Sequence, residues 1–163
     1  MTEISAQYYG MKIRIAEGDS VNREFFGFCA NGEFRLQRCC ACNLLRYPPT
    51  TACPWCADSS SSWEKVDSTG TIYSYTEVQH AIQPELARHT PYAVLIVELD
   101  AQKDLPTVGY ALRVVGNLVD RNGILLSGES LNSFRIGSRV SMVFTPIAEG
   151  ISLPQWIQTE EMA

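Results

Sequence analysis

The sequence has no long apolar run and few of the side chains that perform chemistry in enzymes. No stretch reaches the roughly 20 apolar residues that a bilayer-spanning helix needs. There are 2 histidines, and the sequence contains no phosphate-binding loop, no dinucleotide fingerprint and no G-x-S-x-G motif. The stretch before Ser20 lacks the basic start and apolar run of a secretory signal. These absences predict a cytoplasmic protein without a catalytic set of its own.

Lysine is scarce, and the charge balance is acidic. The 163 residues contain 3 lysines against 10 arginines, and the formal net charge is −5. Such a chain presents no broad attractive field to phosphate backbones, which argues against nucleic-acid binding. A hydrophobic fraction of 45% is ordinary for a globular protein and allows a packed core.

Cysteine, in contrast, is concentrated in the stretch Phe34–Ala57, which holds 5 of the 6 cysteines. Four of them form the pattern C-x2-C-x10-C-x2-C, namely Cys39, Cys42, Cys53 and Cys56. Two such pairs bring four thiolates to one ion in a tetrahedron, which suits zinc and also a single iron ion. In a reducing compartment, paired cysteines bind metal more often than they form disulfides. The spacing predicts one structural zinc ion, with redox-active iron or two disulfides as alternatives.

Three neighbours of these cysteines, Cys40, Asn43 and Ala57, bear on the prediction. Cys40 adjoins Cys39, but only Cys39 has the two-residue spacing to Cys42. Asn43 and Ala57 follow the two pairs at positions where the backbone often turns left-handed. Asparagine tolerates that conformation better than alanine does, so we expect the second knuckle to be less regular than the first. A site with four cysteine ligands is closed to substrate, which argues against zinc catalysis.

Three arginines, Arg35, Arg38 and Arg46, lie in the same stretch, and no acidic residue lies between Phe34 and Ala57. Arginine forks suit phosphate oxygens. Two interpretations stay open. The arginines are solvated or offset the negative charge of the metal thiolates, or they contact a phosphate-bearing ligand such as a nucleotide-containing cofactor.

A short helix is predicted before the cysteine stretch. Asp19 and Ser20 are good N-cap residues, apolar residues recur on one helix face from residue 21 to 29, and Asn31-Gly32 can end the helix. The three phenylalanines of this segment pack on the chain itself or dock on a partner. Residues 1–18 show no sustained period and are expected to be extended or partly mobile.

A small β-barrel is predicted after the cysteine stretch. Runs rich in β-branched and aromatic residues predict strands at 71–78, 92–99, 108–115 and 140–145, and Asn122-Gly123 predicts a hairpin turn. The tail from Leu153 is expected to lie across the barrel. We divide the chain into an N-terminal extension with the helix (1–33), a cysteine ribbon (34–66) and a barrel with a C-terminal tail (67–163).

This order of elements resembles the acyl-CoA-associated family that joins a rubredoxin-like zinc ribbon to an OB-fold. The matching segments, which span roughly residues 20–155, are Phe25-Phe26 through Gly32, Leu36-Gln37-Arg38-Cys39, Arg46-Tyr47-Pro48-Pro49, Cys53-Pro54-Trp55-Cys56, Gly70 to Tyr75, Pro91 to Asp100, and Phe134 to Phe144. The resemblance implies a mainly β chain with an N-terminal helix, a zinc ribbon and a C-terminal OB-fold barrel. The chain departs from the family between Gly116 and Leu131, where it carries extra residues.

The resemblance also implies a role. Members of this family are non-catalytic partner subunits of thiolase-like enzymes, and some help hold the CoA ester. We therefore expect a required, cytoplasmic subunit of a thiolase or related acyltransferase complex, with CoA near Arg35, Arg38 or Arg46. The thiolase that cleaves an aromatic succinyl-CoA in anaerobic toluene degradation is a candidate complex. The alternative is a nucleic-acid-binding module, because OB barrels and zinc ribbons also serve that purpose.

Overall fold

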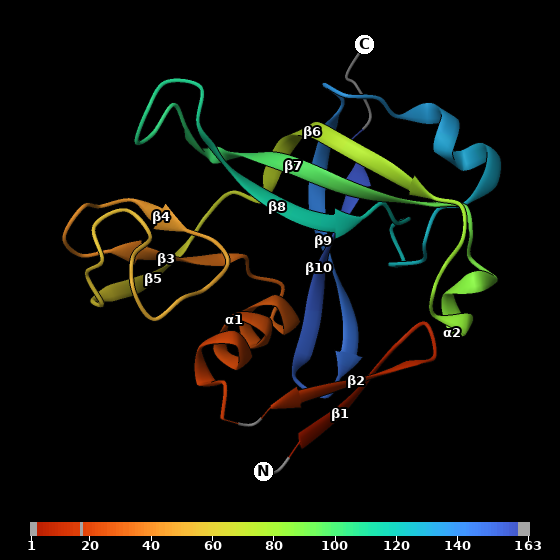
Figure 1. The fold of residues 1–163 in the computed structure, drawn as a ribbon, viewed down its shortest axis with the longest axis horizontal. Coiled ribbons are helices and arrows are strands. Elements are labelled where there is room, and N and C mark those ends of the chain that lie inside the picture. The colour runs from red at the N-terminus through yellow and green to blue at the C-terminus, as the bar shows by residue number, and fades with distance from the viewer. Residues whose placement is uncertain (1–2, 17, 160–163) are drawn as a thin grey trace.

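The computed structural model describes residues 3–16 and 18–159, which form a β-barrel, a cysteine ribbon, a helix and an N-terminal hairpin (Figure 1). The elements are, in chain order, β1 (Glu3–Tyr8), β2 (Met11–Ala16), α1 (Ser20–Ala30), β3 (Arg35–Cys39), β4 (Leu45–Arg46), β5 (Ser61–Lys65), β6 (Thr69–Val78), α2 (Pro84–Ala87), β7 (Tyr92–Lys103), β8 (Ala111–Asn117), the 3-10 helix η1 (Gly128–Ser133), β9 (Arg139–Ala148) and β10 (Ile151–Gln158).

The barrel is built from five strands in the order β10-β9-β6-β7-β8. All neighbouring strands in this sheet are antiparallel. A parallel bridge between Leu118 and Trp156 joins the end of β8 to β10, and the Val119 N–H donates to the Trp156 carbonyl at 2.8 Å. The first strand therefore pairs with the second and fourth, and the third strand closes on the fifth, which is OB-fold topology. The predicted fold class is confirmed.

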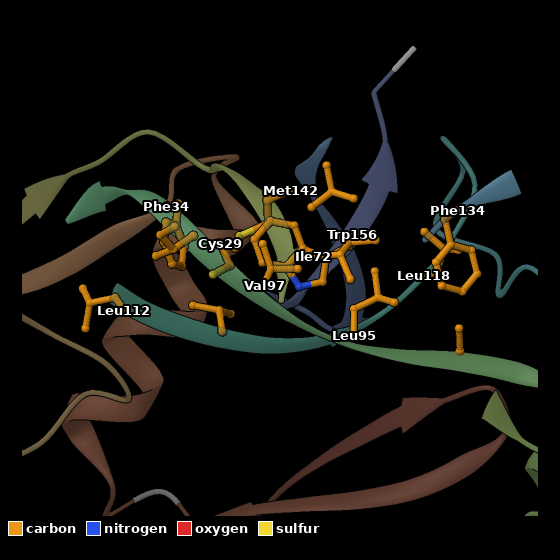
Figure 2. Close-up of a cluster of buried hydrophobic side chains, with 14 of the residues drawn as sticks. Cys29, Phe34, Ile72, Leu95, Val97, Leu112, Leu118, Phe134, Met142 and Trp156 are labelled. Carbon is orange, nitrogen blue, oxygen red and sulfur yellow. The ribbon is translucent and has the colours of Figure 1, made fainter. Parts of the chain in front are cut away.

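The core of the barrel follows from alternation along its strands. On β7, Leu95, Val97 and Leu99 are each fully buried, and the residues between them face outward. Trp156 belongs to the same cluster and is drawn with Leu95 and Val97 in Figure 2. The same cluster continues through Cys29 of α1 and Phe34 before β3, so the helix and the ribbon share the core of the barrel.

Helix α1 forms where the sequence predicts it and packs on its own chain. The Asp19 carboxylate accepts the Asn22 N–H at 3.2 Å and caps the helix. Phe25 and Cys29 are buried, and the Phe28 ring meets Trp63 of β5 at 5.3 Å between centroids. Because the phenylalanines have partners within the chain, the contacts favour internal packing over docking.

The N-terminal residues form a β-hairpin that the sequence does not reveal. Strands β1 and β2 pair antiparallel through a turn at Tyr9 and Gly10, which both have positive φ. Ala6 and Tyr8 of this hairpin pack against Ile147 and Ile151.

The C-terminal segment is also a strand that the sequence does not predict. Residues 151–158 pair with β9 and do not form a tail across the barrel. Pro154 argues against a strand in the sequence, because proline is rare inside sheets.

The segment with the Asn122-Gly123 turn also contacts the N-terminal hairpin. Val119 and Leu125 form an antiparallel bridge, and the Gly123 N–H donates to the Asp120 carbonyl at 3.0 Å. The Tyr9 hydroxyl donates to the Gly123 carbonyl at 2.5 Å. The predicted turn is therefore present, and two segments far apart in sequence hold each other.

Gln102 joins the barrel to the ribbon. Its amide oxygen accepts the Leu45 N–H at 2.8 Å, its amide nitrogen donates to the Leu45 carbonyl at 3.3 Å, and the side chain is 4% exposed. We expect Gln102→Leu to lower the free energy of unfolding by about 1–3 kcal/mol, because both Leu45 groups lose their buried partner. Urea denaturation measures this loss. The exposed Gln79→Leu is the control, and an equal loss in both variants would contradict the role of Gln102.

Asp100 is the centre of a polar network on the outer face of the barrel. It accepts hydrogen bonds from Arg139 and, at 2.9 Å, from the Thr69 hydroxyl, and Lys103 Nζ lies 2.6 Å away. The Arg139 guanidinium holds the pKa of the Asp100 carboxyl well below its usual range. A carboxyl whose pKa is lower in the folded state stabilises the fold above its unfolded pKa, and this stability is lost as the pH falls.

Asp100→Asn should therefore cost about 1 kcal/mol of unfolding free energy at pH 7, a value that allows for solvent screening. The difference from the unsubstituted protein should shrink from about pH 4 downward, where the unfolded carboxyl begins to protonate. Urea titrations at pH 7, 4 and 2.5 measure it. A difference that grows toward low pH would contradict the assigned role, and exposed Glu77→Gln provides the control.

Candidate metal centre and its surroundings

The four predicted cysteines meet at one point of the ribbon. The Sγ atoms of Cys39, Cys42, Cys53 and Cys56 all lie within 4.8 Å of one another. Two of these separations are 3.5 Å, between Cys39 and Cys56, and 3.6 Å, between Cys42 and Cys53. All six cysteines of the chain are free thiols rather than disulfides. A group of four sulfurs at these distances could hold one metal ion.

Both knuckles have the same backbone geometry. The Asn43 N–H donates to the Cys39 carbonyl at 3.0 Å, and the Ala57 N–H donates to the Cys53 carbonyl at 2.9 Å. Asn43 has φ 60° and Ala57 has φ 63°. The expectation of a less regular second knuckle is therefore wrong. Ala57 adopts the left-handed conformation although alanine disfavours it, so the turn geometry outweighs the residue's own preference.

The backbone around Cys39 favours its thiolate over its thiol. The Cys42 N–H donates to the Cys39 sulfur and lowers the pKa of that thiol to about 7, and the Ala41 N–H adds to this effect. Thiolates are the form that binds metal. Cys29 shows the opposite behaviour, because burial raises the pKa of its thiol to about 12. Cys29 is a core residue, and Cys40 is exposed and lies outside the group of four.

Two of the three arginines of the ribbon, Arg35 and Arg38, are paired with acids. Arg35 Nε donates to Glu33 Oε2 at 2.7 Å. Arg38 forms a two-pronged pair with Glu64, in which Nη2 lies 2.7 Å from Oε1, and its Nη1 donates to the Asn43 carbonyl. Both acids, Glu33 and Glu64, lie outside residues 34–57. The stretch itself contains no acidic residue, so these partners are not apparent within it. The pairing of β3 with β5 places Glu64 opposite Leu36 and beside Arg38.

Arg46 is buried rather than on the surface. It is 1% exposed, and its Nη1 lies 3.5 Å from the Asp58 carbonyl, which also accepts the Cys53 N–H at 2.8 Å. Within the described ranges, its Nε and Nη2 have no hydrogen-bond partner. A buried cation beside a knuckle fits a centre whose four thiolates carry excess negative charge. The donor set and this cation together fit a four-coordinate metal.

Comparisons with known proteins agree with this architecture. A family model described as the ChsH2 C-terminal OB-fold domain matches residues 63–145. A solved chain titled Ltp2-ChsH2(DUF35) aldolase is similar over 88% of this chain and 98% of that chain, with a TM-score of 0.66 and 27% identity.

A curated relative from Thermomonospora curvata bears the name "Probable enoyl-CoA hydratase alpha subunit" and is 42% identical over 85 residues. These cover 49% of this chain and 25% of the relative, so the chain spans about a quarter of the length of that protein. No helix in residues 3–16 and 18–159 has the length and apolar character to cross a membrane.

The family model matches residues 63–145, which is half of this chain. The chain therefore belongs to the acyl-CoA-associated OB-fold family represented by the C-terminal domain of ChsH2.

Proposed function

We propose that this chain is a non-catalytic accessory subunit of an acyl-CoA-processing complex, in which it docks on a thiolase-like catalytic subunit and helps hold the CoA ester. One observation carries the proposal: the match to the Ltp2-ChsH2(DUF35) aldolase chain covers 98% of that chain, with the ribbon and barrel together. The Thermomonospora curvata relative is likewise named as one subunit of an acyl-CoA enzyme. The division into residues 1–33, 34–66 and 67–163 is part of this proposal.

The metal in this proposal is one structural zinc ion held by Cys39, Cys42, Cys53 and Cys56. Four protein ligands leave no coordination position for substrate, so zinc would stabilise the ribbon and supply no step of the reaction. A ribbon sheet of three short strands is too small to fold on its own core, and metal binding supplies the missing stability.

We also propose that CoA phosphates contact Arg35, Arg38 or Arg46. Such a contact would require each arginine to give up its present surroundings. Arg35 and Arg38 would exchange Glu33 and Glu64 for phosphate oxygens. Arg46 would have to leave the interior of the ribbon, where it is 1% exposed. Arg38 and Arg35 are therefore the better candidates of the three. The aromatic succinyl-CoA thiolase of anaerobic toluene degradation is one complex in which this subunit would fit.

Affinity purification from the native host tests the proposed role. The tagged chain should recover a stoichiometric thiolase-like or related acyl-CoA enzyme subunit, identified by mass spectrometry, in a complex that survives gel filtration. Recovery of the chain alone, or of nucleic acid in place of an enzyme subunit, would overturn the proposal and in the second case favour a nucleic-acid-binding module. The salt dependence of binding to single-stranded RNA would confirm that outcome.

A further inference from the structure

A cavity of about 300 Å³ lies where the N-terminal hairpin, α1, the ribbon and the barrel meet. Phe26 of α1 and Tyr47 of the ribbon form its aromatic wall, and Val94 and Val115 of the barrel form an aliphatic wall. The strands that border it, β8 and β10, pair only near Trp156, so the cavity opens along the seam of the barrel. Every residue that lines it is uncharged.

Three polar side chains converge at one end of this cavity. Asn117 Nδ2 and Gln155 Nε2 both donate to the Tyr8 hydroxyl oxygen, the second at 2.9 Å. The Gln155 amide oxygen in turn accepts the Asn117 N–H at 2.6 Å. Tyr8 and Gln155 are 7% and 3% exposed, so this end of the cavity is formed by largely buried residues.

The polar end offers one donor and one acceptor. The Tyr8 hydroxyl oxygen accepts hydrogen bonds from both amide nitrogens. The hydroxyl proton of Tyr8 takes part in neither bond. Burial raises the pKa of the Tyr8 hydroxyl far above its ordinary value, so the proton stays in place at neutral pH. The Asn117 bond to Tyr8 uses its nitrogen and leaves its carbonyl oxygen as an acceptor. A secondary amide, with one C=O and one N–H, is the ligand group that matches such a pair.

We infer that this cavity binds a neutral, amide-bearing chain, and, resting on the proposed function, that this chain is the pantetheine arm of the CoA ester. The arm carries two secondary amides, methylene groups and a dimethyl carbon, and it has no charge. An amide of the arm would form hydrogen bonds with Tyr8 and Asn117. Its apolar groups would pack against Phe26, Tyr47 and Val115. An uncharged lining disfavours the phosphates, which would lie outside the cavity.

The inference is tested with pantetheine itself as the probe and the full-length chain as the protein. Saturation-transfer difference NMR should show contact at the dimethyl and amide-flanking protons, with a Kd on the order of 1 mM for so small a ligand. Adenosine 3′,5′-diphosphate, which carries the charged part of CoA, should show at least about tenfold weaker binding to this cavity.

Val115→Trp should fill the cavity, since Val115 is 55% exposed at its wall and tolerates a larger side chain. We expect at least a tenfold loss of pantetheine affinity, which corresponds to about 1.4 kcal/mol. Val108→Trp is the matched control, because Val108 is 94% exposed and lies outside the cavity. Absence of pantetheine contact, or equal binding by the two tryptophan variants, would overturn the inference.

The outcome separates this inference from the proposed function. A chain that assembles with an acyl-CoA enzyme but shows no contact with pantetheine overturns the cavity inference and leaves the subunit role intact. A chain that binds pantetheine in a Val115-dependent manner but has no enzyme partner supports the neutral-chain site and overturns the subunit role.

Discussion

Cys39→Ser is expected to remove the metal from the ribbon and to unfold that part of the chain. Its sulfur belongs to the group of four that lie within 4.8 Å, and the backbone N–H groups of Cys42 and Ala41 lower the pKa of its thiol. Structural zinc stabilises small zinc-binding folds by an apparent 10–16 kcal/mol near pH 7, so losing one of four thiolates is a severe change. Metal analysis should find zinc falling from about one ion per chain to nearly none.

Cys40→Ser is the matched control for this experiment. Cys40 is the adjacent residue, it is exposed, and it lies outside the group of four. The Cys40 variant should keep its zinc and the protease resistance of residues 34–66, and the Cys39 variant should lose both. Zinc retention in the Cys39 variant, or zinc loss in the Cys40 variant, would show that the ligands are assigned wrongly. Iron in the purified protein in place of zinc would support the alternative of a redox-active iron site.

Gly70→Ala is the second change for which we expect a large effect. Gly70 lies on β6 between Leu99 of β7 and Val140 of β9. A Cβ at this position would lie 2.4 Å from the Glu98 carbonyl oxygen and 2.6 Å from a Val97 methyl group. Since the first of these is backbone within a sheet, the strand has to move. We expect a loss of about 3 kcal/mol or more in unfolding free energy, measured by urea denaturation.

Gly27→Ala provides the comparison. Gly27 lies within α1, and the nearest atom to its added Cβ would be the Gly150 carbonyl oxygen at 4.0 Å. Alanine has a higher helix propensity than glycine by up to about 1 kcal/mol, so this variant should be as stable as the unsubstituted protein or more stable. Similar stability of the two alanine variants would contradict the close approach of β6 and β7.

The metal cluster could be predicted from the sequence because it is a local feature. Each C-x2-C pair closes its own turn, and only ten residues separate the two pairs. The barrel strands were predictable for a related reason, since β-branched and aromatic residues are abundant in 92–99 and 71–78. The family resemblance supplied the order in which the strands close.

The arginine environment could not be predicted, because it depends on strand register. Arg38 meets Glu64 only because β3 and β5 pair, and these residues are 26 positions apart in the chain. The cavity is even harder to predict from the sequence. Its lining residues Tyr8, Phe26, Tyr47 and Asn117 come from four different segments of the chain. The hairpin at 3–16 was missed because it is short and depends on Ile147 and Ile151 for its packing.

Reconstitution of activity tests the central claim most directly. The catalytic subunit recovered with this chain is purified alone and assayed for acyl-CoA cleavage or acyl transfer, with and without an equimolar amount of this chain. The subunit role predicts that this chain alone has no activity, that the catalytic subunit alone has little, and that mixing restores it. Full activity of the catalytic subunit without this chain would contradict the claim.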